Sequence, residues 1–527
     1  MRKKISMMLA LVLILSLFAG CGVTQPSNPT GTSAATSGQT SAAEPKRTDV
    51  NISVAQALTT VDPHGTTYVA DRITLWQIYE GLTFYNELTG EIEPRLAESW
   101  TVSDDGTVYT FKLRQDAYFH NGDPVKASDA AFSINRCTEK ERPIYMYGTN
   151  IEGATAIDDY TLEVKLSASY APFLINSTML FIISEREVKE QGDAFGTKVT
   201  GAGTGPYKLS YLDADERITL EAFDKYYSGE ASIKTVNIYP IFDSAAGLIS
   251  FESGDLDWYN CTVTDYLRIK DEGKFNSEAT IANHMSFVAI NPQSKHTALA
   301  DERVRKAIAY AINKDECNYA AFDGYGEVAD YLENPNKTVG APKGDVVYNY
   351  DPDKCQQLLA EAGYPNGVDV GTILCFTGNH FEVMATVIQS QLEKVGIHAE
   401  LEWAEQATTL NRGRAKDYDI FVTGGNCSGD YDNLRKRFYT PQMALTYVDF
   451  TKTEYDWQWM DNMIDAASAT ADPEKRLEMN KELNDYFMNT ATYLPILHKC
   501  VPYVWNKDLN IEHNCPVNPI IYNWSWS

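Results

Sequence analysis

Stretches in which apolar and polar residues alternate predict β-strands in the first part of the chain. Residues 51–55 alternate in this way, and so do residues 107–113 and 161–166, each of which follows an Asp-Asp pair. Alternation with a period of two places successive side chains on opposite faces of a strand. Another strand is expected to begin at residues 206–209.

Apolar residues at helical spacing predict helices, above all after residue 300. The expected helices cover residues 75–82 (ended by Gly81), 303–312, 352–362, 381–395 and a long segment from Asp472 through Phe487, with a strand at 397–403. Asp351 before Pro352 is typical of an N-cap followed by a first-turn proline. Strands and helices mixed without a fixed repeat period indicate the α/β class.

The N-terminus predicts export. Arg2, Lys3 and Lys4 precede an apolar run over residues 7–19, which is shorter than the roughly 17–25 residues that span a bilayer. This pattern is typical of a secretory signal over residues 1–20. The run ends in Ala19-Gly20-Cys21, similar to a bacterial lipobox, although Phe18 stands where leucine is usual.

Cys21 is therefore the expected lipid anchor, and the alternative is an ordinary cleaved signal with a chance cysteine. Residues 21–48 are made largely of small and polar residues and are expected to form a flexible linker that reaches about 30 Å. The chain beyond this linker is long enough to divide into more than one domain.

The amino-acid composition indicates which classes of binding partner the protein is suited to. The formal net charge of −27 argues against nucleic acids and anionic membrane surfaces as partners. Thirty-two tyrosines and nine tryptophans suit a recognition cleft, although most aromatic side chains simply fill cores. The cysteines other than Cys21 have no metal-ligand spacing; one or two disulfides and buried free thiols both remain open.

The sequence contains no pattern of an enzyme active site. It has no GxSxG, HExxH, GxxxxGK[ST] or EF-hand sequence, and its eight histidines form no zinc cluster. The glycine-rich residues 201–205 lack the GxGxxG spacing of a nucleotide loop. We therefore expect a protein that is not an enzyme and needs no metal or cofactor.

Several motifs resemble one known family. They are Val61-Asp62-Pro63, Tyr79-Glu80-Gly81-Leu82, Pro94-Arg95-Leu96-Ala97-Glu98-Ser99-Trp100, Tyr109-Thr110-Phe111-Lys112-Leu113-Arg114, Asn121-Gly122-Asp123-Pro124-Val125, Gly203-Thr204-Gly205-Pro206-Tyr207, Val304-Arg305-Lys306-Ala307, Tyr350-Asp351-Pro352, Leu358-Leu359-Ala360-Glu361-Ala362-Gly363-Tyr364 and Tyr418-Asp419-Ile420. Their order over nearly the whole chain after residue 49 is similar to that in the family-5 solute-binding proteins, the peptide-binding lipoproteins of bacterial ABC importers.

The resemblance implies a bilobal periplasmic-binding-protein-like fold of cluster C, with an extra domain and a hinge between the lobes. The expected division is lobe I from residues 49–84, 198–283 and 497–527, an extra domain at 85–197, and lobe II at 284–496.

The resemblance also implies a site for a small peptide. In peptide-binding members an Asp after the strand that resembles residues 418–422 pairs with the ligand ammonium, and here Asp430 and Tyr431 match that Asp-Tyr pair. A tryptophan of the same family segment is missing, because Asn426 stands near its place. The alternative for Asp430 is a solvated turn residue beside Asp432.

Further ligand-binding candidates follow from the same resemblance. Arg412 and Arg414 are candidates for the peptide carboxylate. The others are His380 at the start of a helix, the aromatic residues Tyr145 and Tyr147 of the extra domain, and Trp403 with Gln406 as its rival. For the arginines plain surface exposure is the alternative, and for His380 helix capping or exposure.

The resulting hypothesis is a monomeric extracellular lipoprotein, anchored on the outer face of the cell membrane, that captures short peptides between two closing lobes and delivers them to an ABC permease. One alternative keeps this role with a metal complex, an opine or an oligosaccharide as ligand. A secreted hydrolase is the remote alternative.

Overall fold

The computed structural model describes residues 47–527 except 87–88, 428, 443–445 and 513–518. The predicted signal, the expected lipid-anchor residue Cys21 and most of the predicted linker lie outside the described residues. No described helix is long and apolar enough to cross a membrane.

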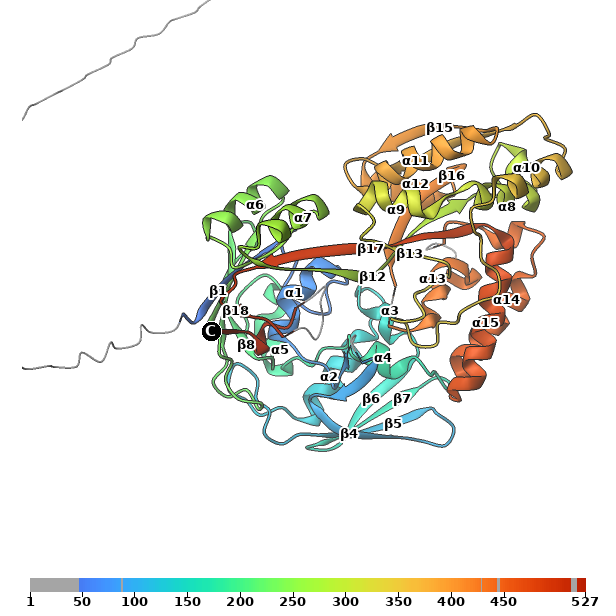
Figure 1. Cartoon of the computed structure of the whole chain (residues 1–527). Helices are drawn as coiled ribbons and strands as arrows, with labels where there is room; N and C mark the ends of the chain where they lie inside the picture. The colour runs from blue at the N-terminus through green and yellow to red at the C-terminus, as the bar shows by residue number, and fades with distance from the viewer. Residues whose placement is uncertain (1–46, 87–88, 428, 443–445, 513–518) are drawn as a thin grey trace, which may run out of the picture. The chain divides into compact units, whose positions relative to one another are not determined.

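One large mixed sheet takes its strands from nearly the whole length of the described chain, from β1 to β17 (Figure 1). Its strands follow the order β15 (Ile397–Ala404), β14 (Val368–Phe376), β16 (Ile420–Asn426), β12 (Asn276–Ile290), β17 (Tyr493–Trp505), β11 (Trp258–Asn260), β1 (Asp49–Val54), β10 (Thr235–Pro240), β9 (Arg217–Ala222) and β8 (Tyr207–Asp213), with β13 (Glu327–Val328) paired to β17. Strand β17, close to the C-terminus, therefore lies in the middle of the sheet.

A second, antiparallel sheet has the order β4 (Ala97–Val102), β5 (Val108–Leu113), β7 (Thr161–Leu166) and β6 (Ile151–Asp158). Helix α2 (Ala127–Cys137) packs against β6 and β7. The short helices α3 (Tyr145–Gly148) and α4 (Phe173–Ser177) belong to the same region, and α5 (Glu185–Gln191) follows it. A short hairpin of β2 (Thr83–Asn86) and β3 (Glu91–Pro94) precedes this sheet.

The remaining helices belong to the two ends of the main sheet. The end that holds β1 carries α1 (Val69–Ile78), α6 (Ser244–Ser253) and α7 (Val263–Glu272). The other end carries α8 (Glu302–Ala311), α9 (Lys314–Phe322), α10 (Pro352–Glu361), α11 (His380–Lys394), α12 (Gln406–Ala415), α13 (Arg435–Phe438), α14 (Trp457–Ala469) and α15 (Pro473–Thr490).

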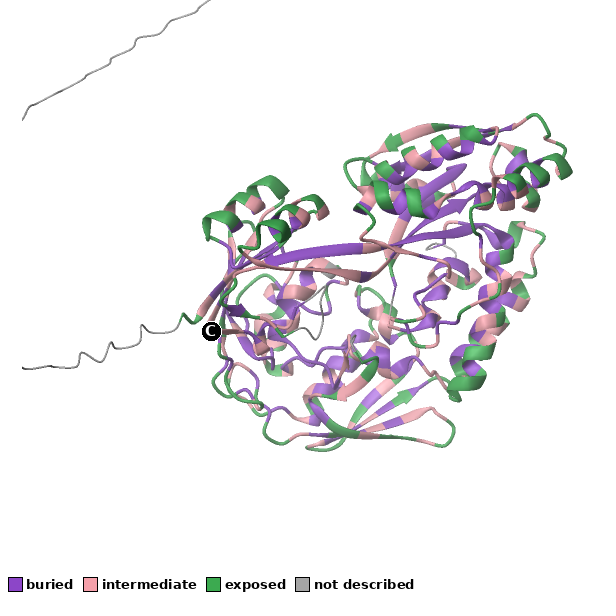
Figure 2. Cartoon of the chain, in the orientation of Figure 1, coloured by how far each residue is buried: buried purple, intermediate pink, exposed green. Residues whose placement is uncertain are grey.

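Buried apolar side chains gather in three main cores. Figure 2 colours the buried residues of each element purple. The lobe I core takes its members from residues 50–79, 181–238, 258 and 503–524. The small-sheet core takes them from residues 82–182, and the lobe II core from residues 285–500. The domain bounds expected from the sequence stay a proposal.

Strands β12 and β17 connect the two lobes. Residues 276–281 of β12 pair with residues 500–505 of β17, and residues 285–289 pair with residues 493–498. The register shifts between these two ladders, so residues 282–284 form an irregularity at the crossing. Such bulges bend a strand and re-aim its side chains, often beside a functional site.

Most elements expected from the pattern are present, including β1, β5, β7, α10, α11, β15 and α15. The helix expected over 75–82 is placed wrongly, because α1 begins at Val69 and ends at Ile78. Gly81 therefore lies beyond the helix and does not end it. The Asp351 side chain accepts a hydrogen bond from the Lys354 N–H, as expected of an N-cap.

The glycine-rich residues 201–205 have a packing role. A Cβ on Gly203 would lie 2.2 Å from the carbonyl oxygen of Ile78, and a Cβ on Gly205 would lie 2.5 Å from that of Gln77. Only glycine permits this close approach to the end of α1. The seven described cysteines are all buried free thiols.

Candidate ligand-binding cleft

A cavity of about 240 Å³ lies where the three cores meet. Lobe I contributes Arg72, Trp76, Glu80, Tyr226 and Tyr522, the hairpin and small sheet contribute Phe84, Arg95, Tyr147 and Asn176, and the β16 side contributes Asn426, Cys427, Gly429 and Lys436. A second cavity of about 710 Å³ shares Tyr147, Asn176 and Lys436 with the first. The two cavities therefore adjoin along one cleft.

Helix α1 places two polar groups on one side of the first cavity. Arg72 and Trp76 are four residues apart and so share one helix face. The Trp76 ring meets Phe84 edge to face, with centroids 6.3 Å apart, and the Arg95 guanidinium lies 4.5 Å from the Phe84 centroid. An arginine over an aromatic face is favourable. Phe84 therefore packs against both Trp76 and Arg95 and helps to fix their positions.

Several buried polar atoms of this wall have no hydrogen-bond partner in the described part of the chain. They are Arg72 Nε, Trp76 Nε1 and Glu80 Oε2. The remaining contact of Arg72 is long, from Nη2 to the Tyr147 hydroxyl at 3.5 Å. Buried polar groups without partners are rare in native proteins, and each needs an explanation.

Glu80 is the carboxylate of the first cavity within the described residues. Its Oε1 accepts hydrogen bonds from the hydroxyls of Tyr226 at 2.8 Å and Tyr227 at 2.7 Å. Burial raises the pKa of Glu80 and outweighs the lowering effects of nearby Arg95 and the tyrosines. The cavity therefore combines three cations, Arg72, Arg95 and Lys436, with one carboxyl group that resists ionisation.

The bulge in β12 forms another wall. Ala282 and Asn283 line the cavity, and the Asn283 carbonyl accepts a 2.9 Å hydrogen bond from the Cys427 N–H. Burial raises the pKa of the Cys427 thiol well above its usual value, so the thiol stays protonated and is a poor nucleophile. The irregularity in β12 and the cavity therefore share Ala282 and Asn283.

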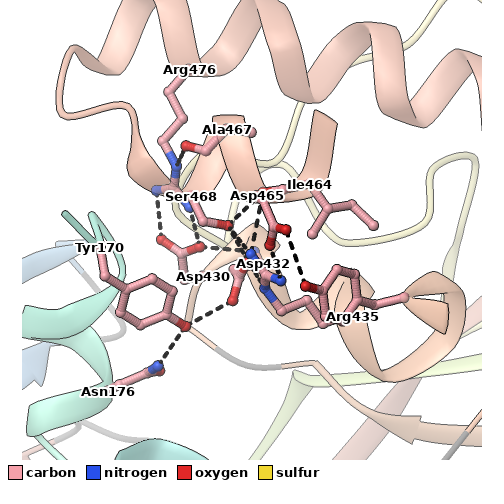
Figure 3. Close-up of polar contacts among 11 residues, drawn as sticks. Tyr170, Asn176, Asp430, Asp432, Arg435, Ile464, Asp465, Ala467, Ser468 and Arg476 are labelled. Atoms are coloured by element: carbon pink, nitrogen blue, oxygen red, sulfur yellow. Dashed lines mark hydrogen bonds and ion pairs between the residues drawn. The ribbon is translucent and has the colours of Figure 1, made fainter. Parts of the chain in front are cut away.

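A polar network joins the small-sheet region to lobe II (Figure 3). The Tyr170 hydroxyl donates to Asp432 Oδ2 at 2.7 Å and accepts from Asn176 Nδ2 at 3.0 Å. Arg435 Nε donates to Asp432 Oδ1 at 2.7 Å, and the Ser468 hydroxyl also donates to this oxygen. The Ala171 N–H donates to the Ser468 carbonyl at 2.7 Å.

Asp430 belongs to the same network and has a cationic partner. Its carboxylate accepts from Arg476 Nη1 at 2.8 Å and from Nη2 at 2.5 Å, and both side chains are buried. Asp430 also accepts from the Asp432 N–H at 2.8 Å. The prediction that Asp430 binds a ligand ammonium stays untested, and its carboxylate already has a counter-ion.

The other predicted site residues divide into two groups. Tyr147 lines both cavities, and Tyr145 lines the second together with Asp430. Neither of these two cavities is lined by Tyr431, Trp403, Gln406, Arg412, Arg414 or His380. Their proposed roles in ligand binding stay untested.

The surroundings of this second group suggest other roles. Arg412 forms an ion pair of 2.6 Å with Glu402, while Trp403, Gln406 and Arg414 are exposed. Tyr431 is buried, with its hydroxyl 3.3 Å from Asn484 Oδ1. His380 packs on Phe381, and burial lowers its pKa to about 3.

Sequence reasoning assigned no role to Arg72, Trp76, Glu80, Arg95 or Lys436. Glu80 and Arg95 lie inside two of the motifs that carry the family resemblance, which was a usable signal. Arg72 and Trp76 could have been paired by their helical spacing, but the misplaced helix hid this. Within the described residues no group of three or more His, Cys, Asp or Glu side chains could hold a metal ion.

Comparisons with known proteins agree with this architecture. The family model of the bacterial extracellular solute-binding proteins, family 5 (middle region), matches residues 91–443. A dipeptide-binding protein of Escherichia coli (strain K12) is 30% identical over 479 residues, 83% of this chain and 86% of the relative.

Solved structures show the same fold. DppA from Helicobacter pylori, in complex with the peptide STSA, has a TM-score of 0.76 at 23% identity and covers 91% of this chain and 98% of its own. NikA from Brucella suis, in complex with Fe(III)-EDTA, has a TM-score of 0.81 at 25% identity and covers 91% and 100%. DppA is described as a periplasmic binding protein, and the similarity over nearly the whole length of both structures confirms the bilobal α/β fold expected from the sequence. With the family model over most of its length and a relative this similar, the chain belongs to family 5 of the bacterial extracellular solute-binding proteins.

Proposed function

We propose that this protein captures a short peptide in the cleft between its lobes, outside the cell, and delivers it to the permease of an ABC importer. The observation that carries the proposal is the cavity itself, whose walls come from lobe I, the small-sheet region and the β16 side. A ligand in this place touches every part that must move together when the lobes close.

The mechanism is closure about the two connecting strands. The β12 irregularity at residues 282–284 is the point at which the paired strands change register, so bending is concentrated there. A ligand stabilises the closed form only through contacts that the open form lacks. The closed form therefore marks a protein with bound ligand, and it is the form that the permease recognises.

Peptide is the proposed cargo because relatives with that name or ligand are similar over most of the chain. The adjoining second cavity offers space for side chains of differing size. A protein that accepts many peptides binds their constant backbone and leaves variable side chains in roomy, hydrated pockets.

A non-peptide solute is the second candidate, and two observations favour it. The NikA relative is described with Fe(III)-EDTA, and a heme-binding protein of Haemophilus influenzae is 26% identical over 473 residues. In addition, Asp430 is paired with Arg476. No enzymatic activity is proposed, because the curated relatives are named as binding proteins.

Native mass spectrometry of the protein purified from its own cells, followed by calorimetry with a mixed di- to pentapeptide library, tests the proposal. We expect a co-purifying peptide and binding heat from the library. Heat from a metal chelate, opine or oligosaccharide with none from any peptide would replace the peptide reading with the second candidate.

Anchoring is proposed at Cys21, on the outer face of the membrane, with the protein acting as a monomer. The test is a Cys21→Ala variant compared with a variant of a buried cysteine, Cys355→Ala. Only the Cys21 variant should move from the membrane fraction into the medium.

A further inference from the structure

The cations of the first cavity differ from three buried arginines elsewhere in the protein, which pair with carboxylates. Arg136 pairs with Asp62, Arg437 with Glu333 and Arg476 with Asp430, each with a nitrogen–oxygen distance of 2.5 or 2.6 Å. In the described part of the chain, no carboxylate lies within 4.0 Å of the charged nitrogens of Arg72, Arg95 or Lys436. These three side chains are partly exposed at the cavity wall, so each can form a charge-assisted hydrogen bond to an anionic group of a ligand.

The unpartnered donors sit together. Arg72 Nε and Trp76 Nε1 are both buried and both lack a hydrogen-bond acceptor, and their side chains share one face of α1 on the cavity wall. Guanidinium and indole N–H groups donate and cannot accept hydrogen bonds. These two donors of α1 therefore call for an acceptor, and the nearby positive charge favours an anion.

We propose that this wall is a carboxylate-binding subsite, in which Arg72 and Trp76 donate to a carboxylate of the ligand while Arg95 and Lys436 neutralise its charge. This inference rests on the proposed function and names the chemical group by which the ligand is recognised. It assigns the main polar anchor to the anionic end of the ligand.

The rest of the cavity agrees with an organic acid. Aromatic side chains line much of it, among them Trp76, Phe84, Tyr85, Tyr147, Tyr226 and Tyr522. These surfaces suit the apolar body of a ligand and offer little to a small inorganic anion. An ammonium anchor has less support, because Glu80 is held by two tyrosines and resists ionisation, and Asp430 is paired with Arg476.

Ligands that differ only at one terminus distinguish a carboxylate anchor from an ammonium anchor. The probes are mixed tripeptides as free acids, the same tripeptides as C-terminal amides, and the same tripeptides with acetylated N-termini, each titrated by calorimetry. We expect amidation to weaken binding at least tenfold and acetylation to change it less than threefold. The reverse order would overturn the subsite.

Variants of Arg72 and Trp76 then test whether the loss of affinity arises at this wall. Arg72→Gln and Trp76→Phe should each weaken binding of the acid at least tenfold and leave binding of the amide nearly unchanged. Arg268→Gln, on the exposed face of α7, is the matched control and should bind the acid as the parent does. Circular dichroism and the melting temperature verify that each variant is folded. Equal loss for acid and amide in Arg72→Gln would overturn the carboxylate assignment.

A second panel distinguishes failure of the subsite from failure of the peptide proposal. It contains Fe(III)-EDTA, an N-carboxyalkyl amino acid, inorganic phosphate and a neutral disaccharide. Binding of an organic acid that Arg72→Gln abolishes, without binding of peptides, would reject the peptide cargo and support the subsite. Binding of phosphate alone, of the neutral sugar alone, or of none of the acids in either panel would overturn it.

Discussion

Asp430 and Arg476 form a buried two-bond ion pair, with oxygen–nitrogen distances of 2.5 and 2.8 Å. Asp430 ends the loop after β16, and Arg476 lies in the first turns of α15. The Arg476 Nε also donates to the Ala467 carbonyl at 3.2 Å. The pair therefore fastens three segments of lobe II to one another beside the second cavity.

This pair predicts a folding defect for Asp430→Asn. Removing one partner leaves a buried guanidinium uncompensated, so the free energy of unfolding should fall by about 3–5 kcal/mol. Urea denaturation measures this change. A ligand anchor predicts the opposite pattern, in which stability is nearly unchanged and affinity is lost.

The matched control for this variant is Asp465→Asn. Asp465 also pairs with an arginine, Arg435, at 2.6 Å, but its side chain is 53% exposed. Exposed pairs contribute about 0–1 kcal/mol, so this variant should lose far less stability than Asp430→Asn. Equal losses in the two variants would contradict the role given to burial.

A second prediction concerns the hydrogen bond from Tyr170 to Asp432, which connects the small-sheet region to lobe II. Tyr170→Phe removes the hydroxyl that Asp432 and Asn176 share. A hydrogen bond to a charged group contributes about 1.5–3 kcal/mol, so the closed form should be less populated and ligand should dissociate at least tenfold faster. Stopped-flow release of a bound ligand measures the rate.

Tyr211→Phe serves as the control, because Tyr211 is exposed on lobe I. It should release ligand at the parental rate. If Tyr170→Phe also behaved as the parent, the Tyr170–Asp432 contact would have no part in closure.

A third prediction links ligand binding to protons through Glu80. Its pKa lies above the ordinary glutamate value because of burial, and an anion bound beside it raises the pKa further. Binding of an anionic ligand should therefore take up protons, and affinity should rise as pH falls through the Glu80 pKa. Calorimetry in two buffers of different ionisation heat, at a series of pH values above the ordinary glutamate pKa of about 4.3, measures the uptake.

The variant Glu80→Gln keeps an acceptor for the two tyrosine hydroxyls and cannot titrate. It should bind the ligand without proton uptake and with affinity independent of pH over the same range. Undiminished uptake in this variant would assign the protons to another group.

The fourth prediction concerns His64, which is fully buried and lies 2.8 Å from the Phe181 carbonyl through Nε2. Burial lowers its pKa from 6.5 to about 4. Between these values the unfolded chain binds a proton that the folded protein does not, so stability falls as pH falls. The loss at pH 4 amounts to about 3 kcal/mol from this side chain.

Denaturation at a series of pH values tests this. Replacing the ring by His64→Gln should reduce the slope of the unfolding free energy near pH 5 by about one proton, whatever its effect on stability at neutral pH. An unchanged slope would contradict the assignment.

The sequence predicted local elements well and the ligand site poorly. Alternation located β5 and β7, and Asp351-Pro352 located the start of α10, because these signals depend on neighbouring residues alone. Asp430 was selected by its place in a motif, and no local pattern indicates that Arg476, far along the chain, lies against it. The cleft residues Arg72 and Lys436 become neighbours of one cavity only through the fold.

Strand β17 has a consequence for how the protein acquires its structure. It supplies the centre of the main sheet, yet its residues 493–505 are among the last to be synthesised. Neither lobe can complete its sheet until this segment arrives, and contacts between such distant residues slow folding. We therefore expect fragments that lack residues after 492 to stay unfolded as a whole, so that lobe I and lobe II are not separable folding units even though each has its own core.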